Sequence, residues 1–191
     1  MLDEIVPPLV AAAQARARQR GFSMSCDPAV GALLAVLAGH LPEGSRVLEL
    51  GTGTGVGTAW IVSGLAPRTD VTVLSVEKDP ATAAAAASGD WPSFADLRCG
   101  DALEVLGAGG TFDLIFADAP GGKWEGLDRT IAALRPHGLL LVDDMTPGPD
   151  WDDSRRAAQD KVRQALLSAP ELASAELAAG SGMILSARRG Q

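Results

Sequence analysis

Three acidic side chains follow two apolar stretches of the chain. Asp118 ends the run Phe112-Asp-Leu-Ile-Phe-Ala, and the pair Asp143-Asp144 follows a second run at residues 138–142. If both runs are central strands of a parallel sheet, their carboxyl ends meet at one edge and the three carboxylates converge. Three oxygen ligands suit a hard divalent cation, Mg²⁺ by preference. A solvated acidic rim is the alternative, although a cation would stabilise the adjacent charges of Asp143 and Asp144.

A second stretch whose residue types suggest a binding site is Val47-Leu-Glu-Leu-Gly-Thr-Gly-Thr-Gly-Val-Gly57. Four glycines stand in it at every second position. An apolar run that ends in glycine predicts a buried parallel strand followed by a turn. Glycine there lets a ligand approach the main chain closely. The dinucleotide fingerprint G-x-G-x-x-G fits no register of these glycines. Glu49 would repel a pyrophosphate but suits an ammonium group; a surface turn without a ligand is the alternative.

This stretch resembles the first motif of the class I methyltransferases that use S-adenosylmethionine (SAM), whose amino-acid end carries an ammonium group. Glu77 lies 20 residues after Gly57, near the offset at which an acid accepts both ribose hydroxyls. Asp101, followed by the small Ala102, matches the position that meets the adenine, and it also suits a helix N-cap. The cofactor-binding residues that the motif and the resemblance together indicate are Met24, Ser25, Glu49, Gly51, Thr52, Gly53, Gly55, Gly57, Glu77, Lys78, Asp101, Ala102 and Asp118. For Met24 the alternative is a hydrophobic plug shared with Phe22.

Residues 112–145 look like the metal-dependent small-molecule O-methyltransferases of the catechol and caffeoyl-CoA type. In that family an Asp after the fourth strand and an Asp-Asn pair after the fifth hold the metal, and a Lys acts as general base. The resemblance assigns the metal to Asp118, Asp143 and Asp144, and the catalytic roles to Asp118 and Lys123. Two features depart from the family. Asp144 stands where Asn is usual, and Lys123 follows Asp118 by five residues, a longer spacing than in the family.

Composition limits the class of protein. The 191 residues are 47% hydrophobic, enough for one globular domain with a full core. The formal net charge of −8 disfavours nucleic acid as a partner, because binding phosphates needs a surplus of Lys and Arg. Cys26 and Cys99 are too few for a disulfide framework and favour a reducing cytoplasm. We expect no membrane span and, from the Met-Leu-Asp-Glu start, no signal peptide.

Alternating apolar runs and helical segments predict the framework that positions these residues. Strands are expected at 45–50, 71–76, 95–98, 112–117 and 138–142, with a final antiparallel pair at 172–178 and 182–188. Helices are expected at 8–20, 28–39, 56–65, 80–88, 101–106, 123–134 and 152–168. This order predicts an α/β fold, a Rossmann-like, doubly wound, mostly parallel seven-stranded sheet with helices on both faces. We expect a single domain over residues 1–191, in which the helices of residues 1–40 cover the cofactor and acceptor site.

Taken together, the motifs predict an enzyme that transfers a methyl group from SAM to a hydroxyl of a small, catechol-like molecule, assisted by a divalent metal. Three alternatives stay open: a metal-independent N- or O-methyltransferase, a nicotinamide oxidoreductase, and a non-catalytic SAM-binding protein. The glycine spacing disfavours the oxidoreductase. Trp124 and Trp151 are candidates for an aromatic wall against a flat acceptor, with buried packing as the alternative. The expected partner is a small-molecule acceptor, and the resemblance also allows a homodimer.

Overall fold

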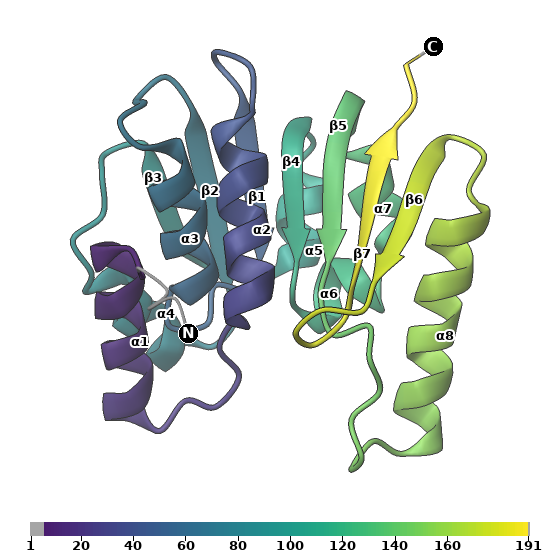
Figure 1. The fold of residues 1–191 in the computed structure, drawn as a ribbon, viewed down its shortest axis with the longest axis horizontal. Coiled ribbons are helices and arrows are strands. Elements are labelled where there is room, and N and C mark those ends of the chain that lie inside the picture. Colours follow the sequence, from purple (N-terminus) through teal and green to yellow (C-terminus); the bar gives the residue numbers. More distant parts are fainter. Residues whose placement is uncertain (1–5, 191) are drawn as a thin grey trace.

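Within residues 6–190, which the computed structural model describes, the chain forms one sheet of seven strands with helices on both faces (Figure 1). Among these strands β7 runs antiparallel to both β5 and β6, and all other neighbouring pairs are parallel. The expected fold class is confirmed, including the antiparallel C-terminal pair. In their order across the sheet the strands are β3 (Ala95–Cys99), β2 (Thr72–Glu77), β1 (Arg46–Leu50), β4 (Phe112–Ala117), β5 (Leu134–Val142), β7 (Met183–Arg188) and β6 (Leu172–Leu177).

Different helices bury the two faces of the sheet. In β4, Leu114 and Phe116 pack in one core with α1 (Pro8–Arg20), α2 (Pro28–Gly39) and α3 (Val56–Leu65). The alternate residues Ile115 and Ala117 pack in a second core with α5 (Ala102–Gly107), α7 (Leu127–Ala132) and α8 (Asp153–Ser168). Successive side chains of a strand point to opposite faces, so a continuous apolar run fills both cores at once. The remaining helices are α4 (Pro80–Ala87) and α6 (Pro120–Lys123).

One predicted helix is wrong. Within the expected helix 123–134, the short helix α6 ends at Lys123, the short helix α7 covers only Leu127–Ala132, and β5 begins at Leu134, four residues before the expected start. Gly126, between the two helices, has a φ of 76°, a left-handed conformation that no α-helix continues through. The start of β5 contains Pro136, His137 and Gly138, which in sequence are typical of a turn. All other expected elements begin and end within one residue of the observed bounds.

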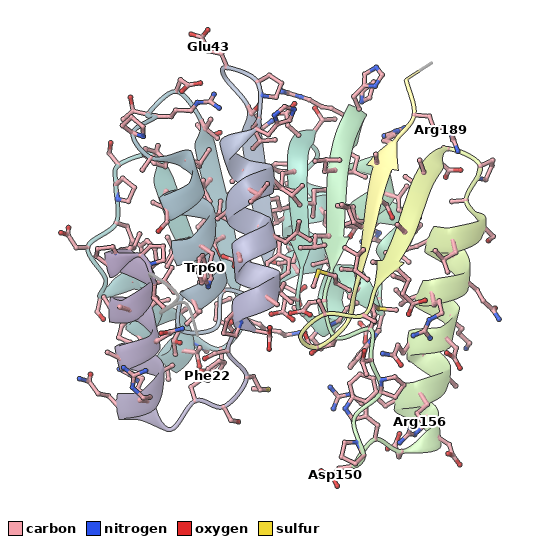
Figure 2. All side chains as sticks on the ribbon, viewed as in Figure 1. Phe22, Glu43, Trp60, Asp150, Arg156 and Arg189 are labelled. Carbon is pink, nitrogen blue, oxygen red and sulfur yellow. The ribbon has the colours of Figure 1, made fainter. Side chains whose placement is uncertain are left out.

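The loops that follow the parallel strands gather at one edge of the sheet, the lower edge in Figure 1. The segment 21–27 between α1 and α2 lies at the same edge, where Phe22 is labelled in Figure 2. Residues 1–5 lie outside the described part of the chain, and with them the start on which the signal-peptide expectation rests. Among residues 6–190, no helix combines the length and apolar character that crossing a bilayer requires.

Candidate functional site

The glycine turn joins β1 to α3 at the carboxyl edge of the sheet. Gly51, Gly53 and Gly55 have φ values of 101°, 54° and 91°, a region that glycine occupies without steric cost. A Cβ atom at Gly51 would lie 2.5 Å from the backbone oxygen of Asp118. The helical Gly57 needs glycine for space, because a Cβ there would collide with a carboxylate oxygen of Glu49. The sequence pattern is therefore required by both backbone conformation and packing.

A cavity of about 620 Å³, here called the glycine-turn cavity, opens beside this turn. Of the residues predicted to bind the cofactor, the cavity is lined by Met24, Ser25, Glu49, Gly51, Thr52, Gly53, Gly57, Glu77, Lys78, Asp101, Ala102 and Asp118. Gly55 is the exception. It is the N-cap residue of α3, and a Cβ there would lie 2.8 Å from the ring of Trp91, outside the cavity lining.

Two acids at strand ends shape the outer part of this cavity. Glu77, the last residue of β2, accepts hydrogen bonds of 2.9 Å from the backbone N–H groups of Gly53 and Asp79, which ties the glycine turn to the next strand. Asp101 caps α5 by accepting from Leu103 N at 2.8 Å, and its other oxygen pairs with Lys78 Nζ at 2.9 Å. The hydrogen bond from Lys78 lowers the pKa of Asp101.

Glu49 is the buried acid of the glycine-turn cavity, with 1% of its surface exposed. The hydroxyl groups of Thr58 and Ser75 both donate to its Oε2. Burial nevertheless raises the pKa of Glu49 to about 7, because the two hydrogen bonds only partly offset the loss of water around the charge. A cationic ligand group that reached this carboxylate would stabilise its ionised form.

A second, larger cavity of about 1080 Å³ adjoins the first and is called the aspartate cavity here. Its lining includes Asp118, Asp143, Asp144 and Lys123. One carboxylate oxygen from each aspartate lies within 4.8 Å of the others, so the predicted convergence of these three acids is observed. Asp118 lines both cavities, and so does the segment 22–26 apart from Ser23, which lines only the aspartate cavity. The two cavities therefore meet at the carboxyl end of β4.

Lys123 reaches the three aspartates despite its long spacing from Asp118. Its side chain is 2% exposed, and Nζ lies 3.1 Å from Asp144 Oδ2 and 3.9 Å from Asp118 Oδ1. The loop folds back because Gly121 and Gly122 are non-helical, with a φ of 89° at Gly122. Burial raises the pKa of Asp118 well above its usual range, and the neighbouring ammonium of Lys123 opposes that shift.

Residues 48–145 match the family model of a methyltransferase domain, a span that includes the glycine turn, Lys123 and the three aspartates. A protein from Mycobacterium sp. (strain JLS), provisionally named an O-methyltransferase, is 34% identical over 193 residues, which cover 94% of this chain and 86% of that protein. The chain belongs to the SAM-dependent O-methyltransferase family. Membership of this family excludes two of the alternatives, the nicotinamide oxidoreductase and the non-catalytic SAM-binding protein.

Solved structures share the fold of the methyltransferase. Cofactor-bound Rv0187 from MTB is 27% identical and superposes with a TM-score of 0.80, covering 97% of this chain and 92% of that one. The O-methyltransferase TomG from Streptomyces achromogenes, solved in complex with SAM, shares the fold with a TM-score of 0.81 at 22% identity, covering 99% and 93% of the two chains.

Two residues that contact the aspartates of the methyltransferase are absent from the sequence-based predictions. Ser181, in the turn between β6 and β7, donates its hydroxyl to Asp143 Oδ1, which also accepts from Asp144 N at 2.6 Å. Gln159, fully buried on α8, donates from Nε2 to the backbone oxygen of Asp144 at 2.7 Å. Both lie far from the motifs in sequence, and only tertiary packing brings them to the site. Of the two tryptophan candidates, Trp124 lines the aspartate cavity and Trp151 does not.

Proposed function

We propose that this methyltransferase transfers the methyl group of SAM to a hydroxyl oxygen of a small, catechol-like acceptor, with a divalent cation held by Asp118, Asp143 and Asp144. The observation that carries the proposal is the convergence of these acids with Lys123 where the two cavities meet. Methyl transfer requires the donor sulfur and acceptor oxygen to approach in line, and a shared border between two binding spaces suits that geometry. Relatives named as O-methyltransferases support oxygen as the acceptor atom.

In this proposal SAM occupies the glycine-turn cavity. Asp101 and Ala102 contact the adenine, Glu77 accepts from the ribose hydroxyls, and Glu49 faces the ammonium group of the methionine end. All of these residues line the glycine-turn cavity, and Asp118 lines both cavities. The methyl group would then be directed toward the aspartate cavity. The N–H groups of Gly51 and Thr52 already donate to the backbone oxygen of Val76, so the turn would contribute close approach to the main chain, and the side chains of Met24, Ser25 and Lys78 complete the proposed contacts.

The residues around the three aspartates fit a hard cation. All three offer carboxylate oxygens, the ligand type that Mg²⁺ prefers. Hydrogen bonds from Ser181 and from the N–H of Asp144 orient the carboxylate of Asp143, as partners of metal ligands commonly do. When bound, the cation would lower the pKa of an acceptor hydroxyl that coordinates to it. Lys123 lies beside the same carboxylates, and only in its neutral amine form is it the candidate that accepts the proton of that hydroxyl.

The ion pair between Lys123 and Asp144 also favours a second candidate, a metal-independent methyltransferase. The buried ammonium of Lys123, 3.1 Å from Asp144, already supplies one positive charge to the acidic cluster. A cation would have to share the cluster with that ammonium or displace it. In the metal-independent case Lys123 and Asp118 would position the acceptor hydroxyl directly.

Calorimetric titration of Mg²⁺ into the protein saturated with S-adenosylhomocysteine (SAH) separates the two candidates. We expect saturable binding in the wild type and in Asp128→Ala, whose exposed residue on α7 serves as a control. Asp143→Ala should lose Mg²⁺ binding and turnover but keep its affinity for SAH. Undiminished turnover in excess chelator, with no Mg²⁺ binding, would rule out the metal and favour the second candidate.

The net charge supports a small molecule as the acceptor, and the cysteines support a reducing compartment as the location of the protein. The net charge of −8 disfavours nucleic acid as acceptor. Both cysteines lie within the described residues and are free thiols, Cys26 buried and Cys99 exposed. Free thiols of this kind persist in the cytoplasm, which is the compartment we propose.

A further inference from the structure

Arg155 lines the aspartate cavity and is held there by two tryptophans. Its guanidinium carbon lies 3.9 Å from the ring centre of Trp151 and 5.3 Å from that of Trp124. The two indole planes are nearly perpendicular, at 85°, so the cation contacts two rings of different orientation. Stacking of this kind fixes a guanidinium group while leaving its N–H edges available. The side chain is therefore positioned without using its hydrogen-bond donors.

The stability of α8 does not explain an arginine at this position. Asp152 is the N-cap residue and accepts from the backbone N–H of Arg155 at 2.7 Å, so Arg155 belongs to the first turn of the helix. Positive charge in a first turn is disfavoured by the helix dipole. Within residues 6–190 no carboxylate pairs with the guanidinium group of Arg155. Arg155 therefore carries an exposed guanidinium group that stacks on two tryptophans but meets no carboxylate of the described residues, and its donors are open to a ligand.

The aspartate cavity is lined by charges of both signs. The three aspartates and Lys123 form one cluster, in which the acids outnumber the cation. Arg155 lies on α8 at the cavity wall, and Arg18 lines it from α1, which Figure 1 shows on the other side of the sheet edge. Lys123 Nζ and the guanidinium carbon of Arg155 both lie 5.3 Å from the ring of Trp124. One small aromatic molecule beside Trp124 can thus reach both groups.

We propose that Arg155 is a specificity-determining residue that binds a carboxylate of the acceptor, and that the acceptors are aromatic hydroxy acids rather than neutral phenols. The hydroxyl to be methylated would face Asp118 and Lys123, the ring would lie along Trp124, and the carboxylate would accept two parallel hydrogen bonds from Arg155. Such a fork-to-carboxylate contact discriminates strongly between an acid and its uncharged analogue. The inference rests on the proposed O-methyl transfer and adds the charge class of the acceptor.

The test compares protocatechuate with its neutral amide as acceptors for the wild type, Arg155→Gln and Arg155→Lys. We expect the wild type to prefer the acid, and Arg155→Gln to raise the KM for the acid by roughly 10- to 100-fold. The kcat and the KM for SAM should stay unchanged, and the KM for the amide, whose carbonyl oxygen accepts only a hydrogen bond without opposite charge, should rise far less than that for the acid. Arg155→Lys keeps the charge but loses the fork, so its KM should be intermediate. Arg129→Gln, an exposed arginine on α7 outside both cavities, is the matched control.

Two results would overturn the role of Arg155: no preference for the acid in the wild type, or an equal effect of Arg155→Gln on both acceptors. If neither compound is methylated, the proposed function is in doubt, and binding decides the role of Arg155 separately. Calorimetry with protocatechuate and the SAH-saturated protein should then show binding that Arg155→Gln weakens by the same factor. Equal affinity in the wild type and the variant, or no binding to either, would also overturn the proposal.

Discussion

The two cavities that meet at Asp118 are built from different kinds of structure. The glycine-turn cavity is formed mainly by the ends of β1, β2 and β4 and the short segments that directly follow β1, β2, β3 and β4, together with residues of the segment 22–26. The aspartate cavity takes its walls from α1, the first turn of α8 and the turn between β6 and β7. The first is therefore specified by local spacing and the second by long-range packing. Loops can change the acceptor without disturbing the cofactor site.

Among the variants that test whether the two cavities act independently, Lys123→Met should have the largest effect on kcat. The change removes the buried ammonium from the aspartate cavity and leaves a side chain of similar length. Because the proposed role of Lys123 is proton transfer, we expect kcat to fall by roughly 10²- to 10⁴-fold. The affinity for SAH, measured by calorimetry, should stay within about two-fold, since Lys123 does not line the glycine-turn cavity.

Lys161→Met, at an exposed position on α8, controls for the loss of one positive charge. A fall in SAH affinity that matches the fall in kcat would mean that the two cavities do not act independently. A variant with full activity would remove Lys123 from the reaction.

Gly57→Ala should have the next largest effect, and on the cofactor side. The added methyl group would collide with the carboxylate of Glu49 and lie 3.1 Å from Phe116, both of which are buried. Forcing a methyl group into a packed site costs about 1–3 kcal/mol, which we expect as lower stability to denaturant. If Glu49 moves in response, SAH affinity should fall by roughly 10- to 100-fold.

Gly107→Ala is the matched control, because a Cβ at that position on α5 meets no atom within 4 Å. It should leave SAH binding unchanged and raise stability by up to about 1 kcal/mol through helix propensity. Normal stability and SAH affinity in Gly57→Ala would show that the close packing of the glycine turn on Glu49 does not matter for the cofactor.

The same contrast explains how much the sequence predicts. The seven strands, and all but one of the expected helices, follow from apolar runs and caps, and the convergence of the three aspartates follows from the parallel sheet. The position of Lys123 depends on the conformation of Gly121 and Gly122, which spacing alone does not determine. Gln159 and Arg155 come to the site only through the docking of α8. Periodicity marks the buried face of a helix but does not identify what that face contacts.

The pH dependence of SAH binding tests the role of Glu49 on the cofactor side. Its pKa of about 7 in the ligand-free protein means that the ionised fraction falls about tenfold between pH 8 and pH 6. If the ammonium group of SAH requires the ionised form, its affinity should fall by about the same factor over that range. Calorimetry on Glu49→Gln should show weaker binding with a flat pH profile, and an unchanged slope would remove Glu49 from the contact.

Glu49 also affects stability, with a sign set by its raised pKa. The unfolded protein loses this proton near the ordinary value of 4.5, whereas the folded protein keeps it until about pH 7. Stability should therefore fall as the pH rises from about 4.5 to about 7, by up to about 3 kcal/mol, and change no further above that. Denaturant midpoints for the wild type and Glu49→Gln should differ in slope over that window.

The smallest expected effect on kcat comes from Gln159, a residue of α8 that contacts the backbone of Asp144. Asp144 has a φ of 58°, a left-handed conformation that a non-glycine residue adopts at a cost, and Gln159 bonds its backbone oxygen from a fully buried position. Gln159→Leu removes this bond at similar volume, so Asp144 should be held less firmly, and kcat should fall by about 5-fold for about 1 kcal/mol. SAH affinity should be unchanged, and Gln164→Leu, exposed on the same helix, should have no effect. If Gln159→Leu lowers stability but leaves kcat intact, Gln159 supports the packing of α8 and not the position of Asp144.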